Sequence, residues 1–207
     1  MPNTTRRALL ATAPATLIPR WVHAATEATP RASEGPFYPV ELPSDHDNDL
    51  VLVEGAVRQA GGEILHLNGI LRDTAGMPIP NGLIDIWQCD VNGVYLHPGS
   101  PGYRNFDQGF QGFGRAAADV DGRFAFRTIV PTVYPGRTPH IHLKAYGGGW
   151  ELLTTQFYLA DHPLNARDGL FNRMSAAEQA RQTMTLRPFG AGEGTAQQTE
   201  IAVVIGN

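Results

Sequence analysis

The chain has 207 residues, of which 42% are hydrophobic and 17% are charged. This composition is typical of a soluble globular protein, and the length suffices for one domain with its own core. The formal net charge is −4 and would be −7 without the three arginines among residues 1–24, which argues against nucleic acid as a partner. The single cysteine, Cys89, cannot form an internal disulfide. Since it lies in the alternating run "LIDIWQCD", we expect a small buried or half-buried strand residue.

The N-terminus has the layout of an export signal. Paired arginines, Arg6 and Arg7, precede an apolar run over residues 8–18 and the small-residue stretch "VHAA". This pattern predicts a twin-arginine (Tat) signal over residues 1–24, cleaved after Ala24, and a periplasmic or secreted protein; a cytoplasmic N-terminus is the alternative. The apolar run is too short to cross a bilayer, so we expect no membrane span. Removing residues 1–24 leaves 13 of the 16 Lys and Arg residues against 20 Asp and Glu.

The next segment, residues 25–60, is rich in proline, glycine and acids and is predicted to be an N-terminal arm that wraps the domain. Residues 61–207 form the predicted domain. Short β-type runs alternate there with turn clusters, and 23 glycines and 16 prolines fit such a pattern. The run "ADVDGRFAF" predicts a tight Asp-Gly turn. The clearest strand candidates are residues 64–73, 83–88, 122–130, 140–146, 152–159 and 200–206.

These runs predict an all-β fold, a β-sandwich of about seven or more strands with long loops. One helix is expected near the C-terminus, over residues 175–184, because Ser175 and Glu178 have the spacing of a capping box.

The stretch "TVYPGRTPHIHLK", residues 132–144, concentrates groups that can do chemistry. On a strand His140 and His142 point the same way, with their Cα atoms roughly 6.5 Å apart, so both can address one metal ion. Alone, such a pair is as compatible with a half-exposed strand face as with two ligands. Tyr134, in the turn before the strand, and Tyr95, in "NGVYLH", favour a metal site.

Two imidazoles and two phenols suit ferric iron. A phenol has a pKa near 10 and stays protonated at neutral pH unless a highly charged cation replaces its proton. Zinc and copper(I) prefer thiolate or imidazole ligands, and the chain has no second cysteine. Two phenolates and one hydroxide would neutralise Fe(III), which allows burial of the site. A zinc or copper enzyme that uses the histidine pair with other donors is the alternative.

Several spaced motifs resemble one known family: "EGPFYP" (34–39), "IWQCDVNGVYLH" (86–97), "GFGRAAADVDGRFAFRTIVPTVYPGRTPHIH" (112–142) and "LTTQFYLADHPL" (153–164). Over residues 33 to about 164 the chain resembles the intradiol ring-cleavage dioxygenases, on the protocatechuate 3,4-dioxygenase side of that family. The resemblance implies a non-haem Fe(III) site in a β-sandwich. The implied protein ligands are Tyr95, Tyr134, His140 and His142, with a solvent hydroxide as the fifth ligand.

The resemblance also implies roles beyond ligation. Tyr134 is the tyrosine that leaves the iron when substrate arrives, and Arg137 steadies negative charge that develops on the substrate; a solvated turn arginine is the alternative for Arg137. Gln156 matches a glutamine of the family near the metal, although an ordinary satisfied strand amide fits it equally well. Tyr38 either lines the mouth of the site or anchors the arm.

The implied reaction is cleavage of a catechol-type diol between its hydroxyl-bearing carbons with O2, giving a muconate-type diacid. The partners are then a small catecholic substrate and O2, with no nicotinamide or flavin. Only Pro135 and Gly136 separate Tyr134 from Arg137, whereas protocatechuate enzymes have a longer loop there with bulky residues that wall the pocket. A non-catalytic β-sandwich module that binds a small molecule or a partner is the alternative function. Which diphenol is cleaved, and whether the chain forms a homo-oligomer, are left open by the sequence.

Overall fold

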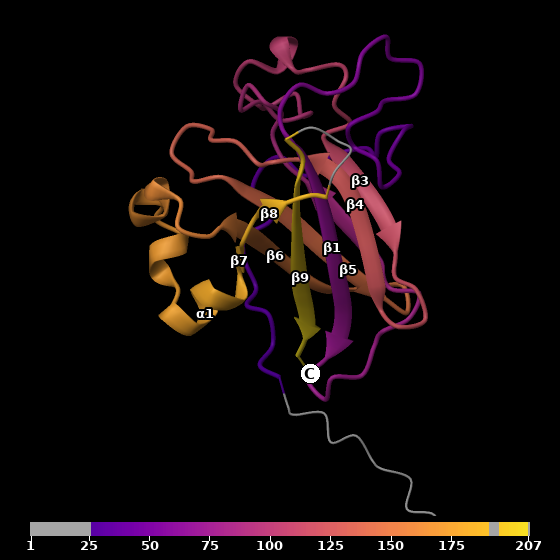
Figure 1. Ribbon diagram of the computed structural model, residues 1–207, viewed down its shortest axis with the longest axis vertical. Coiled ribbons are helices and arrows are strands. Elements are labelled where there is room, and N and C mark those ends of the chain that lie inside the picture. Colours follow the sequence, from indigo (N-terminus) through magenta and orange to yellow (C-terminus); the bar gives the residue numbers. More distant parts are fainter. Residues whose placement is uncertain (1–25, 191–194, 207) are drawn as a thin grey trace, which may run out of the picture.

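The computed structural model describes residues 26–190 and 195–206. The predicted export signal, residues 1–24, lies outside the described residues. Two packed sheets form the body of the protein (Figure 1), so the predicted β-sandwich is confirmed.

The first sheet has the strand order β4-β1-β9-β8 and the second has the order β3-β2-β5-β6-β7. Most neighbouring strands are antiparallel, but β1 pairs with β9, and β6 with β7, in parallel. The strands are β1 (Ile64–Asp73), β2 (Leu83–Trp87), β3 (Phe113–Ala117), β4 (Arg123–Ile129), β5 (His140–Gly147), β6 (Trp150–Leu159), β7 (Thr183–Met184), β8 (Arg187–Pro188) and β9 (Gln197–Ile205).

The core lies between the sheets and follows from the alternation in the sequence. On β1, Leu65, Leu67 and Leu71 are buried, while the exposed Asn68 lies on the other face. Each fully buried leucine contributes about 2 kcal/mol relative to an exposed one. The strand β5 departs from this rhythm, because residues 140–145 are all buried. A strand buried on both faces needs cover on its outer side, and the arm supplies part of that cover.

Six of the strands occupy the ranges that the sequence indicates, within a few residues at each end. The predicted Asp-Gly turn is present between β3 and β4, where the Asp119 carboxylate accepts hydrogen bonds from the backbone of Asp121 and Arg123. Gly122 has a φ of 75°, which a residue without a side chain adopts at little cost. The strands β3, β7 and β8 were not expected, and each is short.

The predicted helix is present as α1, Ala176–Arg181, and is shorter than the expected 175–184. Ser175 is its N-cap, and the capping box with Glu178 is complete. The helix ends early because the chain from Thr183 pairs with β6 as β7. Three 3-10 turns also occur, η1 (Tyr103–Asn105), η2 (Pro163–Arg167) and η3 (Phe171–Arg173). No helix in the described ranges is long and apolar enough to cross a membrane.

The arm, residues 26–60, contains no regular strand or helix and runs along both sheets. The Thr29 N–H donates to the carbonyl of Val204 in β9, and the Ala32 N–H donates to the carbonyl of Thr154 in β6, both at 2.9 Å. Leu50, farther along the arm, is fully buried in the core. The arm is therefore part of the folded domain, and it brings residues 34–38 to the outer side of β5.

Candidate metal centre

Two imidazoles meet at the start of β5. His140 and His142 are 1% and 2% exposed, and their Nε2 atoms lie 3.1 Å apart. His142 stands opposite Trp87 of β2 in the strand register, and the two rings stack with centroids 4.7 Å apart. Because residues two apart on a strand share a face, the spacing in the sequence produces this pair directly.

The hydrogen bond of His140 leaves its second ring nitrogen free for a ligand. His140 Nδ1 lies 2.7 Å from the carbonyl oxygen of Thr138, and since a carbonyl only accepts, Nδ1 carries the proton. The lone pair of His140 is then on Nε2, facing His142. Burial, with Arg137 next, lowers the pKa of His140 to about 3. Burial, followed by His140, also holds the pKa of His142 well below its ordinary value. Both rings are therefore neutral at pH 7, the form that binds metals.

Two tyrosines complete the cluster. Tyr95 is 2% exposed, and the centroids of the Tyr95 and Tyr134 rings lie 5.2 Å apart. Tyr134 is 5.6 Å from His140 and Tyr95 is 6.0 Å from His142, both measured between ring centroids. Burial raises the pKa of both phenols, and for Tyr134 the nearby Arg137 opposes this effect. Either phenolate at neutral pH would thus need a cation beside it.

The donor set fits a hard, highly charged metal ion. Adjacent ligand nitrogens on one ion, each at ~2.1 Å from it, are separated by about 3 Å when they subtend a right angle, close to the observed 3.1 Å. The hydroxyl oxygen of Tyr95 is buried and has no hydrogen-bond partner among the described residues. A buried polar group without a hydrogen-bond partner lowers the free energy of unfolding by roughly 1–3 kcal/mol. Among the described residues, no group of three or more His, Cys, Asp or Glu side chains could hold a metal ion.

Arg137 borders the cluster and is held on several sides. Its Nε donates to Asp168 at 2.8 Å, its Nη1 to the hydroxyl of Tyr134 at 3.3 Å, and its Nη2 to Gln156 Oε1 at 2.7 Å. Nη2 also lies 3.3 Å from the hydroxyl of Tyr158. This side chain is only 15% exposed, so the solvated-turn alternative does not describe it.

Gln156 is fixed from both ends of its amide. Its Nε2 donates to the carbonyl of Ser33 at 2.6 Å, while its Oε1 accepts from Arg137 and, at 2.8 Å, from Tyr158. The six residues singled out in the sequence therefore lie in one cluster: Tyr95, Tyr134, Arg137, His140, His142 and Gln156. Tyr103 is 39% exposed in η1 and is not part of it.

The sequence did not indicate Asp168, which pairs with Arg137. This carboxylate is fully buried and also accepts from the backbone N–H groups of Thr138, Leu170 and Phe171. Burial by itself raises its pKa, but those N–H groups and Arg137 outweigh it, so the pKa is lowered. An acid directly after "PLNAR" in an irregular segment offers no pattern that could have identified it.

The arm adds a second unexpected contribution. Phe37 stacks on Tyr95 with centroids 4.7 Å apart, and Gly35 lies so close to His142 that an added Cβ would stand 3.3 Å from Cε1. Tyr38 instead donates to the buried Asp85 at 2.8 Å. Of the two alternatives for Tyr38, the contacts are those of an anchor, and Phe37 is the arm residue beside the tyrosines.

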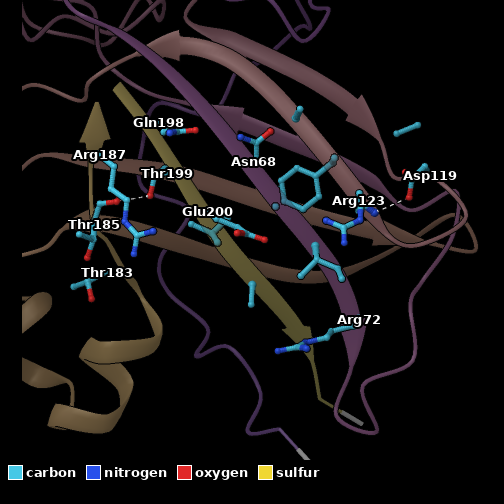
Figure 2. Close-up of a pocket in the computed structure, with 17 residues that line it drawn as sticks. Asn68, Arg72, Asp119, Arg123, Thr183, Thr185, Arg187, Gln198, Thr199 and Glu200 are labelled. Carbon is cyan, nitrogen blue, oxygen red and sulfur yellow. Dashed lines mark hydrogen bonds between the residues drawn. The ribbon is translucent and has the colours of Figure 1, made fainter. Parts of the chain in front are cut away.

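Of the hollows among the described residues, two bear on the site, one beside the cluster and one on the outer face of the first sheet. The smaller, the Arg167 pocket, has a volume of about 460 Å³ and adjoins the cluster through Tyr134 and Arg137; Val133, Pro135, Gly136, Thr138, Leu164, Arg167 and Asp168 complete its lining. The larger, the outer-sheet groove, measures about 1080 Å³ and lies over β1, β4 and β9. Figure 2 shows Asn68, Arg123 and Glu200 projecting over those strands. None of the six clustered residues lines this groove.

The protein is a two-sheet sandwich that holds two histidines and two tyrosines in one cluster. Comparisons with known proteins identify its family. Residues 33–188 match the family described as "Dioxygenase". The protocatechuate 3,4-dioxygenase beta chain of Burkholderia cepacia is 32% identical over 173 residues, covering 79% of this chain and 72% of that protein. Catechol 1,2-dioxygenase of Pseudomonas sp. (strain EST1001) is 31% identical over 172 residues, and the match covers 70% of this chain and 52% of that enzyme.

A solved structure agrees. The dioxygenase domain of a dioxygenase carbohydrate-binding protein fusion from Streptomyces sp. SirexAA-E superposes with a TM-score of 0.67 at 31% identity, covering 87% of this chain and 99% of that one. The chain belongs to the intradiol ring-cleavage dioxygenase family and is an oxidoreductase. It spans about half the length of the catechol 1,2-dioxygenase that it matches.

Proposed function

We propose that the protein is a non-haem Fe(III) dioxygenase that cleaves a catechol-type diol between its two hydroxyl-bearing carbons and releases a muconate-type diacid. The observation that carries the proposal is the pair of Nε2 atoms 3.1 Å apart, with the partnerless Tyr95 hydroxyl close by. The family's named members, which include catechol 1,2-dioxygenase and hydroxyquinol 1,2-dioxygenase, support the substrate class.

Four side chains would hold the iron: His140 and His142 as neutral donors, and Tyr95 and Tyr134 as phenolates. The charge of two phenolates offsets most of the charge of Fe(III), which reduces the free-energy cost of burying the ion. When bound, ferric iron would withdraw electron density from a coordinated catecholate, so that dioxygen can attack a ring carbon. Both oxygen atoms enter the diacid, and the reaction needs no external reductant.

The side chains supply the proton transfer and the charge stabilisation. A catechol must lose two protons to bind as a dianion, and in this proposal the Tyr134 phenolate oxygen accepts one of them. The other goes to solvent. Tyr134 suits this role better than Tyr95, because Tyr134 is only half-buried and lies at the start of a turn through Pro135 and Gly136, whereas Tyr95 is buried.

Arg137 serves as a fixed cation beside the reacting ring. Its guanidinium donates toward Tyr134, so a negative charge that develops near that oxygen finds a donor already in position. Gln156 and Asp168 hold the other nitrogens of the guanidinium. These two residues would act by positioning Arg137, without contact to the substrate.

The test combines metal analysis with oxygen uptake. The purified protein should contain iron, show the colour of tyrosinate-to-iron charge transfer, and consume one O2 per catechol cleaved. Tyr95→Phe should bleach most of that colour and weaken iron retention, while Tyr103→Phe, in the exposed η1 turn, should leave both intact. Protein that carries zinc or no metal, and that cleaves no catechol when loaded with iron, would overturn the proposal.

We propose further that the protein is exported in the folded state. A site loaded with iron in the cytoplasm would be lost from a chain that is threaded unfolded, and the paired Arg6 and Arg7 fit the folded route. Replacing both arginines by lysine should leave the protein in the cytoplasm. Unchanged appearance in the periplasm would contradict this assignment.

A further inference from the structure

We propose that the Arg167 pocket receives the substituent of a catechol that carries an apolar arm ending in a carboxylate, and that Arg167 selects for the negative charge. The proposal rests on the function proposed above, since it assigns the part of the substrate that does not react.

The position of the pocket makes it an extension of the reaction site. Tyr134 and Arg137 line the pocket and also belong to the cluster of ligands and charges. A group that projects from a ring held beside these two side chains would therefore lie next to the pocket. The short Pro135–Gly136 connection leaves this side open, because no longer loop stands between Tyr134 and Arg137.

The size of the pocket exceeds what one ring needs. A cavity of about 150 Å³ suffices for a benzene molecule in a protein interior, and this pocket has about 460 Å³. An unsubstituted catechol would leave most of it filled with water. A substituent of several carbon atoms would displace that water from apolar walls, which is favourable in proportion to the area buried.

The lining indicates the chemistry of the substituent. Val133, Pro135 and Leu164 provide the apolar walls. Of the charged groups in the lining, Asp168 is fully buried and paired with Arg137. Arg167 is exposed, and its side chain has no hydrogen bond or ion pair with any residue that the structure describes. Among the described residues that line the pocket, the unpaired charge is therefore the positive charge of Arg167, which is complementary to a carboxylate.

The test uses a matched pair of substrates that differ only in charge. Dihydrocaffeate has a carboxylate at the end of a short apolar arm, and its methyl ester has the same arm without the charge. We expect kcat/KM to be about fivefold higher for the acid, the size of one partly solvated ion pair. Arg167→Gln should bring the ratio of acid to ester close to one. Arg173→Gln, which removes another exposed arginine, in η3 outside the pocket, should leave the ratio unchanged.

Two further measurements separate charge from shape. Raising the salt concentration should reduce the acid-to-ester ratio of the unaltered protein, because exposed charges are screened. Leu164→Trp should lower the kcat/KM of both substituted catechols relative to that of catechol itself, because the larger side chain fills the pocket.

The outcomes distinguish failure of this inference from failure of the proposed function. If catechol and both substituted forms are all inert with iron-loaded protein, the proposed function is wrong. If all three are cleaved but the acid-to-ester ratio is the same in the unaltered protein and in Arg167→Gln, the role of Arg167 is overturned. If Leu164→Trp affects catechol as strongly as the substituted forms, the pocket does not hold the substituent.

Discussion

The outer-sheet groove and the histidine-tyrosine cluster differ in size and in the state of their polar groups. The groove is the larger hollow, and polar side chains that line it, such as Asn68 and Glu200, are exposed to water. In the cluster, His140, His142 and Gln156 are almost completely buried. Burying such groups costs free energy that water-exposed groups do not incur, and in the cluster the Tyr95 hydroxyl lacks even a hydrogen bond. An isolated buried atom without a hydrogen bond, Arg72 Nε, also occurs in a residue that lines the groove. The convergence of several buried donor groups, rather than volume or a single unpaired atom, therefore marks where a ligand is expected.

The substitution Tyr134→Phe is the strongest test of this comparison. If Tyr134 is a ligand at rest and a proton acceptor during turnover, its loss should lower turnover per bound iron by about 10²–10⁴-fold, the typical contribution of a general base. The protein should still bind iron through Tyr95, His140 and His142.

A purely structural tyrosine would behave differently. Its loss would lower the free energy of unfolding by a few kcal/mol at most and leave turnover per folded, iron-loaded molecule nearly unchanged. Turnover is therefore to be normalised to measured iron content. A value near that of the unaltered protein would remove Tyr134 from the catalytic set.

Asp168→Asn should produce the next largest effect. The variant leaves Arg137 without its buried counter-charge, and changes to residues that orient a metal site typically cost about 10–100-fold in activity. The loss should appear mainly in kcat, since the substrate contacts remain. A normal kcat with only a lower melting temperature would show that Asp168 serves stability alone.

The same variant has a predicted pH dependence. The pKa of Asp168 is lowered in the folded protein, so its ionised form stabilises the fold above the unfolded pKa of about 3.9. That contribution is lost as the pH falls through the folded pKa. The difference in unfolding free energy between the unaltered protein and Asp168→Asn should therefore be full at pH 5–8 and shrink below about pH 4. A difference that is constant down to pH 2 would contradict the assignment.

Much of this arrangement follows from sequence pattern, and the rest depends on how distant segments meet. His140 and His142 are adjacent on one strand face by local geometry alone, and the alternation of β1 specifies its buried side. The unexpected Phe37 reaches Tyr95 only because the arm crosses the outer side of β5. No local pattern encodes such a path.

The strands that were missed have a similar cause. The strand β3, "FGRAA", is short and has little hydrophobic alternation, and it is ordered by pairing with β2. Arg115 within it forms a two-pronged ion pair with the buried Asp85, at 2.6 and 2.7 Å. The two-residue strands β7 and β8 exist only as partners of β6 and β9. In each case tertiary contact, rather than intrinsic propensity, decides the structure.

Tyr38→Phe tests the anchor of the arm and should have a moderate effect. It removes the hydrogen bond from the Tyr38 hydroxyl to Asp85, which keeps its two bonds from Arg115, and the 3.2 Å hydrogen bond between the Tyr38 and Tyr146 hydroxyls. We expect a loss of about 1–3 kcal/mol in the free energy of unfolding, the net value of two hydrogen bonds. Denaturant unfolding measures it, with Tyr103→Phe as the exposed control. Loss of iron with unchanged stability would instead place Tyr38 in the site.

The smallest effect is expected for Glu200→Gln in the outer-sheet groove. Glu200 is exposed on β9, in the sheet that does not contain β5, and the hydrophobic core between the two sheets is roughly 10 Å thick. Changing its charge should alter turnover by less than about twofold. The free energy of unfolding should change by less than about 0.5 kcal/mol, as for most surface substitutions. Steady-state kinetics and thermal unfolding of the iron-loaded protein measure both. A tenfold fall in turnover would show that the groove is coupled to the histidine-tyrosine cluster. The distinction between a solvent-exposed groove without a catalytic role and a buried catalytic cluster would then be wrong.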